Sequence, residues 1–119
     1  MKMRVSRSTT FDAAHFLPGY PGKCARMHGH TWKVAIAVEG EVRADGMVVD
    51  FSVLDQILDE AVVSRLDHGV INDVIENPTA ENIATWIFSA VQVRLPSHVR
   101  LYSVKVWESP ESCAEFYDE

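Results

Sequence analysis

The chain has 119 residues, of which 47% are hydrophobic and 24% charged, and its net charge at pH 7 is −6. This length suits one domain with a core of its own, so we expect a single domain over residues 1–119. The acidic balance argues against general nucleic-acid binding, which depends on neutralising phosphates with Lys and Arg. No apolar run approaches the ~20 residues that cross a bilayer, and the start of the chain lacks the apolar core of a signal peptide, so we expect a cytoplasmic protein that is not bound to membranes.

Basic residues are concentrated in residues 1–38, where Asp12 is the only acidic residue. A basic region of this kind can attract a small anion such as a phosphate ester, although solvated surface charge is the more usual explanation. The basic residues concerned are Lys2, Arg4, Arg7, Lys23, Arg26 and Lys33.

Two strands are predicted over residues 3–15 and 28–42, because apolar side chains recur there at every second position. The alternation is clearest in the second strand, where His28, His30 and Trp32 begin its apolar face. The Pro and Gly residues of segment 18–22 predict a turn between the two strands.

The rest of the chain predicts two helices followed by two strands. Helical spacing covers residues 52–66, and Thr79 is a plausible N-cap of a second helix that ends before Pro96. Shorter strands follow over 99–108 and 113–117. We therefore expect an α+β fold, with a four-stranded antiparallel sheet and both helices on one face. Apolar residues on both faces of the third strand predict that the open face of the sheet is covered by oligomerisation.

Three histidines form a candidate metal site. His28 and His30 are two apart on a predicted strand, so their imidazoles point the same way, and His15 comes beside them if the first two strands pair as a hairpin. Three histidines with an open fourth position are typical of catalytic zinc. A single histidine is more often a core residue, but the pattern of three favours Zn²⁺ as cofactor.

Cys24 has three possible roles, as a fourth metal ligand, as a catalytic thiol or as a small apolar residue. Its cationic neighbours Lys23 and Arg26 and a nearby zinc ion favour the thiolate, which supports a reactive thiol. Cys113 lies by a predicted strand, where we expect a buried and inert residue.

Three further positions carry candidate chemistry with ordinary alternatives. Asp67 can orient His68 as a general acid or base, although adjacency in sequence does not establish contact. Glu108 ends the third strand, where its carboxylate can accept two hydrogen bonds from an amidine-like edge or can simply be exposed. Helix capping alone would explain Thr79.

Six motifs together resemble the 6-pyruvoyl-tetrahydropterin synthase superfamily, and they occur in order over nearly the whole chain. The spacing of Cys24 before His28 is most similar to the branch that makes 6-carboxytetrahydropterin for the synthesis of queuosine and other 7-deazaguanines. The motifs are FDAAH (11–15), CARMHGH (24–30), MVVDF (47–51), LDHGVIND (66–73), NPTAENIA (77–84) and ESP (108–110).

This resemblance implies a tunnelling fold, in which three subunits form a barrel, two trimers stack into a hexamer and active sites lie at subunit interfaces. It also implies roles for individual residues. Zinc would be bound by His15, His28 and His30, protons moved by Cys24 with the Asp67–His68 dyad, and the pterin substrate bound by Glu108 and Thr79.

The reaction implied is the conversion of 7,8-dihydroneopterin triphosphate to 6-carboxy-5,6,7,8-tetrahydropterin, acetaldehyde and triphosphate. Lys23 and Arg26 are candidates for contacts to the triphosphate. One alternative is 6-pyruvoyl-tetrahydropterin synthesis, which eliminates triphosphate but keeps every side-chain carbon. Another is a non-catalytic oligomer that is stabilised by zinc and binds a pterin.

Overall fold

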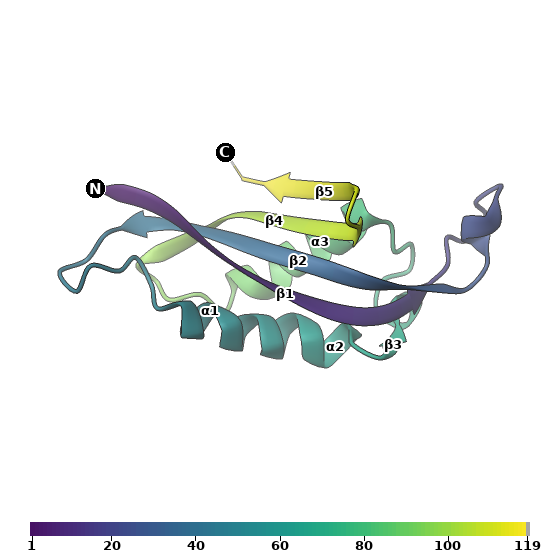
Figure 1. Cartoon of the computed structure of the whole chain (residues 1–119), viewed down its shortest axis with the longest axis horizontal. Coiled ribbons are helices and arrows are strands. Elements are labelled where there is room, and N and C mark those ends of the chain that lie inside the picture. Colours follow the sequence, from purple (N-terminus) through teal and green to yellow (C-terminus); the bar gives the residue numbers. More distant parts are fainter. Residues whose placement is uncertain (119) are drawn as a thin grey trace.

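A computed structural model describes residues 1–118 and contains five strands in one sheet, with the order β3-β1-β2-β4-β5 (Figure 1). All strand pairs are antiparallel except β1 with β3. The strands are β1 (Lys2–His15), β2 (His28–Glu41), β3 (Gly69–Val70), β4 (Val99–Ser109) and β5 (Ser112–Tyr117), and the α-helices are α1 (Phe51–Leu58), α2 (Ser64–Leu66) and α3 (Ala80–Gln92).

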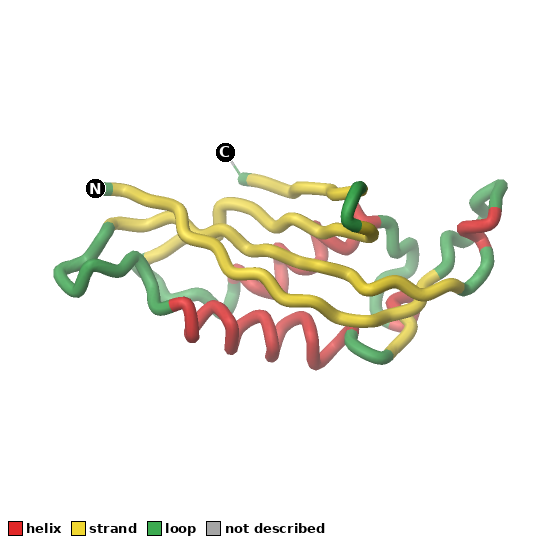
Figure 2. The backbone as a smooth tube through the Cα atoms, in the orientation of Figure 1, coloured by secondary structure: helices red, strands yellow, loops and turns green. Residues whose placement is uncertain are grey.

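The helix predicted over 52–66 is present, but its middle is wound differently. A π-helical segment, Asp59–Val63, joins α1 to α2, so that the three pieces form one continuous coil in Figure 2. Both helices begin at a side-chain cap, and the predicted cap by Thr79 is confirmed. The Asp50 carboxylate accepts a hydrogen bond from the Ser52 N–H (2.8 Å), and the Thr79 hydroxyl accepts one from the Asn82 N–H (3.1 Å).

The helices pack on one face of the sheet, because a single face of β2 is apolar. Trp32, Val34, Ile36 and Val38 are completely buried in one core with the apolar residues of α1 and α3. The indole N–H of Trp32 donates to the carbonyl of Ala13 (3.2 Å), which satisfies the polar atom of the largest core residue. The α+β prediction with both helices on one face is therefore confirmed.

The sheet has five strands, one more than the four that were predicted. Gly69–Val70 pairs in parallel with Ala13–Ala14 at the edge of β1. His68 starts this pairing in a left-handed conformation (φ 59°), and its N–H donates to the carbonyl of Asp12 (2.6 Å). A strand of two residues has no periodicity, so no sequence pattern predicts it.

β4 has apolar residues on both faces as predicted, since Trp107 lies on the side away from the helices, but a β-bulge changes which residues face the core. The register of β4 against β2 shifts between Ala37 and Val38, so Leu101 and Val104 both face the core although their positions differ in parity. Tyr102 consequently lies on the open face, the side of the sheet without helices. Cys113 is exposed on β5, so the prediction of a buried thiol is wrong.

The molecule is elongated, with extents of 53, 26 and 23 Å. β1 and β2 are the longest strands, and their connecting loop, residues 16–27, projects at one end of the molecule (Figure 1). Within residues 1–118, each helix is too short or too polar to span a membrane.

Candidate metal centre and active site

The hairpin of β1 and β2 brings the three predicted histidines together. Its register runs without interruption and sets His15 opposite His28 and Ala13 opposite His30. All three imidazoles consequently lie on the helix-facing side of the sheet, with ring centroids 4.6 to 5.3 Å apart. This convergence is what a shared metal ion requires.

The nitrogen atoms of this cluster are arranged to accept a cation. Nδ1 of His15 donates to the carbonyl of Pro78 (2.9 Å), and Nδ1 of His28 donates to the carbonyl of Arg26 (2.6 Å), which leaves Nε2 of both rings with a free lone pair. Nε2 of His15 and Nε2 of His30 are buried and form no hydrogen bond with any residue in 1–118. Buried polar atoms without partners are costly, and a metal ion would satisfy these.

Burial also favours the metal-binding form of His15. The side chain is 1% exposed, and this burial lowers the pKa of His15 from its ordinary value. The imidazole is therefore neutral near pH 7, as a metal ligand must be.

Glu108 lies within the histidine cluster, a position that sequence reasoning missed. Its Oε1 is 3.1 Å from Nε2 of His30 and 4.0 Å from Nε2 of His15. The carboxylate and the three imidazoles have ligand atoms that all lie within 4.8 Å of one another, so these four residues can hold one metal ion. Lys33 on β2 lies opposite Trp107 on β4. This register places Glu108, the next residue of β4, near His30.

Cys24 lies on a 3₁₀ turn, Lys23–Ala25, beside a cavity of about 500 Å³. The half-buried thiol shares this cavity with Lys23, Arg26, Met27, His28, His30 and Glu108. Within residues 1–118, the group of candidate metal ligands includes no thiol. This arrangement suits a reactive thiol beside the metal centre better than a closed Cys–His site.

Asp67 and His68 form a real contact. Oδ2 of Asp67 accepts a hydrogen bond from Nδ1 of His68 (2.7 Å), while Oδ1 accepts one from the backbone N–H of Asp12 (2.9 Å). The Asp67 hydrogen bond and charge raise the pKa of His68, and the Asp12 N–H is the main cause of the lowered pKa of Asp67. Asp12 in turn accepts from the Thr31 hydroxyl (2.6 Å), so Asp12 and Thr31 fix the dyad to the sheet.

His68 of the dyad and Cys24 line different cavities, and His30 borders both. His68 is 80% exposed and borders a hollow of about 450 Å³ together with Asp12, Gly29, His30 and Thr31, whereas Cys24 belongs to the cavity described above. Thr79 lines neither and serves as the cap of α3. One chain therefore brings His15, His28, His30, Glu108 and Cys24 together, but not the dyad or Thr79.

Comparison with known proteins gives the family. A family model described as 6-pyruvoyl tetrahydropterin synthase matches residues 4–119. The 6-carboxy-5,6,7,8-tetrahydropterin synthase of Synechocystis is 39% identical, over 95% of this chain and 92% of that protein. The dihydroneopterin monophosphate aldolase of Pyrococcus furiosus is 40% identical, over 93% of this chain and 94% of that protein.

A solved structure supports the same assignment. The 6-pyruvoyl tetrahydropterin synthase of Caenorhabditis elegans superposes with a TM-score of 0.87 at 25% identity, and the match covers 100% of this chain and 97% of that one. The expected tunnelling fold of a subunit is thus confirmed, while the names of the three relatives describe three different reactions. The chain belongs to the 6-pyruvoyl tetrahydropterin synthase family of enzymes.

Proposed function

We propose that this enzyme converts 7,8-dihydroneopterin triphosphate and one water molecule to 6-carboxy-5,6,7,8-tetrahydropterin, acetaldehyde and triphosphate, in the synthesis of queuosine and related 7-deazaguanines. The observation that carries the proposal is the cavity that Cys24 shares with His28, His30 and Glu108. The Synechocystis relative supports it, because its name states this product. We place the reaction in the cytoplasm, where free thiols stay reduced.

His15, His28 and His30 are the proposed zinc ligands. The buried Nε2 atoms of His15 and His30 support this role, because a cation would complete their coordination. When bound, zinc supplies Lewis acidity that lowers the pKa of hydroxyl groups on the substrate side chain.

Cys24 and the Asp67–His68 dyad are the proposed proton-transfer groups. Tautomerisation, loss of triphosphate and side-chain cleavage all require protons to leave and reach carbon or oxygen atoms of the substrate. Cys24 acts from the cavity beside the histidines. The raised pKa of His68 keeps its imidazole protonated to higher pH, which suits donation of a proton to a departing oxygen.

Glu108 is the proposed anchor of the pterin ring. A carboxylate accepts two parallel hydrogen bonds from the 2-amino group and the adjacent ring N–H of a pterin. Its distance of 3.1 Å from His30 supports a ring held directly beside the metal ligands. Thr79 is a proposed second contact, because its hydroxyl can still donate a hydrogen bond while its oxygen caps α3.

We further propose that the chain is one domain and that six copies assemble as two stacked trimers. The separate cavities of Cys24 and His68 support assembly, because a neighbouring chain can bring the dyad to the thiol. The sheet supports it too. Among residues 1–118, β3 covers only Ala13 and Ala14 of β1, and β5 has one neighbouring strand, so both edges have backbone groups free to pair with another copy.

Product analysis tests the reaction. Purified zinc-loaded protein is incubated with 7,8-dihydroneopterin triphosphate, and products are identified by mass spectrometry together with an assay for acetaldehyde. We expect equal amounts of 6-carboxytetrahydropterin and acetaldehyde. Triphosphate release without acetaldehyde would instead identify 6-pyruvoyl-tetrahydropterin synthesis, and no turnover would identify the non-catalytic zinc-stabilised oligomer.

A second substrate checks the activity named for the Pyrococcus relative. That protein is 40% identical to this chain and is named for action on dihydroneopterin monophosphate. The monophosphate is therefore assayed in parallel. Turnover of the monophosphate alone would contradict the proposal and assign the chain to aldol cleavage.

A further inference from the structure

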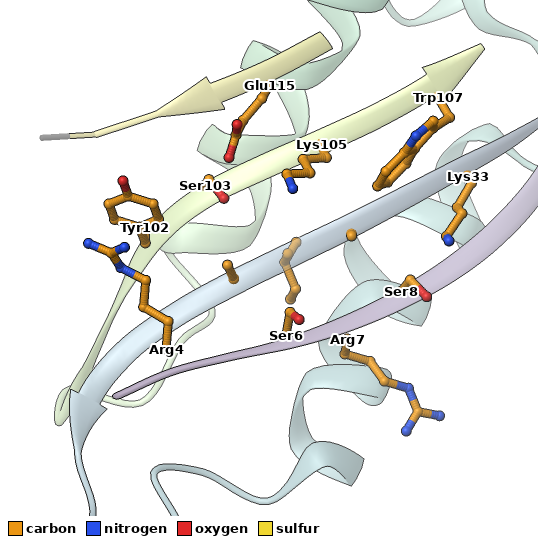
Figure 3. A pocket seen from close by; sticks show the side chains of 13 residues that line it. Arg4, Ser6, Arg7, Ser8, Lys33, Tyr102, Ser103, Lys105, Trp107 and Glu115 are labelled. Atoms are coloured by element: carbon orange, nitrogen blue, oxygen red, sulfur yellow. The ribbon is translucent and has the colours of Figure 1, made fainter. Parts of the chain in front are cut away.

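The open face of the sheet contains a hollow of about 400 Å³ with basic side chains around it (Figure 3). β1, β2, β4 and β5 all contribute to its lining. Its lining includes Arg4, Ser6, Ser8, Lys33, Lys105 and Trp107.

Small side chains create the hollow. Ser6 pairs with Ala37 and Ser8 with Ala35, so two adjacent rows across β1 and β2 have almost no side-chain volume. On β4, Lys105 lies opposite Ala35 and continues the second row. Ser103 lies opposite Ala37 and continues the first row, so the floor has three hydroxyl groups and one ammonium group that face the same space.

Aromatic rings fix a cation at each end of this floor. The guanidinium carbon of Arg4 is 3.6 Å from the ring centroid of Tyr102, and Nζ of Lys33 is 4.8 Å from the ring centroid of Trp107. Figure 3 shows these two pairs at opposite ends of the hollow. The basic groups are held in place before any ligand arrives, which reduces the entropy cost of binding.

Two of the basic groups lack an acidic partner. Among residues 1–118, no carboxylate lies within 4.0 Å of Nζ of Lys33 or of Lys105, although Glu115 is opposite Lys105 on β5. Arg4 does have a partner, Glu39, at 3.1 Å. Glu115 also lines the hollow, but its one carboxylate is outnumbered by the two lysines, so the hollow is a local reversal of charge in a chain with a net charge of −6.

This hollow is separate from the metal centre. Arg4, Ser6, Ser8 and Lys33 have the opposite parity on β1 and β2 from His15, His28 and His30, so they lie on the other side of the sheet. Arg7 is near its rim, but its guanidinium points away and lies 3.3 Å from Asp55 on α1.

We propose that this hollow binds a phosphate-class anion between Lys33, Lys105 and Ser8, with Ser6 and Arg4 extending the site to longer polyphosphates. Lysine ammonium and serine hydroxyl groups are suitable donors to phosphoryl oxygens. The positive charge of the hollow also complements the negative charge of such a ligand. The site does not depend on the reaction in the metal cavity, so it would persist in a protein that turns over no pterin.

Fluorescence of Trp107 provides the test, because this ring contacts Lys33. Zinc-loaded protein is titrated with inorganic triphosphate and with orthophosphate, and binding is measured in parallel by calorimetry. We expect saturable binding that weakens as sodium chloride is added, with triphosphate bound more tightly. Trp107→Phe removes the optical signal but keeps the calorimetric one.

Lysine variants locate the bound anion. Lys33→Gln and Lys105→Gln each remove one charge-assisted hydrogen bond and weaken binding about tenfold. Lys2→Gln is the matched control, because Lys2 lies on β1 outside the hollow and 3.8 Å from Glu39, and it leaves the affinity unchanged. Cys24→Ala also leaves it unchanged, which separates this site from the proposed catalysis.

Other results would overturn the proposal. Equal affinity in wild type, Lys33→Gln and Lys105→Gln would show that the anion does not bind in the hollow. If only the double variant Lys23→Gln/Arg26→Gln lost binding, the anion would be shown to bind in the metal cavity instead. Zinc content is measured at each end point, because triphosphate chelates zinc, and a signal that follows zinc loss would exclude a separate anion site.

Discussion

At the scale of single residues, the proposed chemistry depends most on Cys24. We expect Cys24→Ala to keep one zinc per chain and to reduce kcat about a hundredfold or more, because a lost proton-transfer group typically has an effect of that size. Metal analysis and steady-state kinetics on the same preparation check both points. Cys113→Ala is the control, since that thiol is exposed on β5 and lies outside both cavities. Loss of zinc in Cys24→Ala would contradict the assignment and make the thiol a ligand.

Asp12 offers a separate test of the dyad. Its backbone N–H holds Asp67, while its carboxylate charge adds to the raised pKa of His68. Asp12→Asn keeps the backbone hydrogen bond and removes the charge, so the pKa of His68 should fall. The alkaline limb of the kcat/KM profile should then move to lower pH, because less His68 is protonated.

Titration of the His68 ring by NMR measures this change directly. Asp67 and Asp12 are the charged groups that act on His68, since they are the ones that raise its pKa. Asp73→Asn is the control and leaves both the pKa of His68 and the rate profile unchanged. An unchanged His68 pKa in Asp12→Asn would show that Asp67 alone determines it.

At the scale of secondary-structure elements, α3 tests whether Thr79 contacts the substrate. Thr79→Ala removes the cap and should lower the free energy of unfolding by about 1 kcal/mol. If the hydroxyl also contacts the pterin, KM rises in Thr79→Ala and returns towards the wild-type value in Thr79→Ser. Urea unfolding and kinetics on each variant give both quantities.

The matched control for this experiment is the cap of α1. Asp50→Ala removes a comparable hydrogen bond, to the Ser52 N–H, and should destabilise the fold by a similar amount without raising KM. An equal rise in KM in both cap variants would attribute the effect of Thr79 to stability alone.

Elements with a clear periodicity could be predicted from sequence. β2 has an uninterrupted apolar face, and the three histidines follow from its parity and from pairing with β1. β3 has two residues, and the π-helical segment keeps the apolar spacing of a helix, so neither has a signal of its own. The position of Glu108 depends on the register of β4 against β2, which a bulge shifts and which no local pattern shows.

At the scale of the whole molecule, the proposed assembly makes the active site a product of two chains. Co-expression of Cys24→Ala with His68→Asn tests this sharing, because mixed oligomers contain some sites with an intact thiol from one chain and an intact histidine from its neighbour. Random mixing in a symmetric assembly should restore about a quarter of the wild-type sites. Each variant alone should be nearly inactive.

The turnover rate of the co-expressed mixture is measured, and light scattering gives the mass of the oligomer. The expected mass is six times the 13.3 kDa of one chain. The control is to mix the two purified variants after each has assembled. This mixture recovers no activity if subunits do not exchange. No recovery of activity in a confirmed mixed oligomer would show that each chain provides its own thiol and dyad.

The hydrogen bond from His15 to the carbonyl of Pro78 links the two ends of a long segment of the chain. Pro78 directly precedes the cap of α3, so a metal ion that immobilises the His15 ring also restrains the first turn of that helix. Zinc loading should therefore slow amide hydrogen exchange at Asn82 and Ile83 and leave the first turn of α1 unaffected. The start of α3 would act as a built-in reporter of metal occupancy, readable without any substrate.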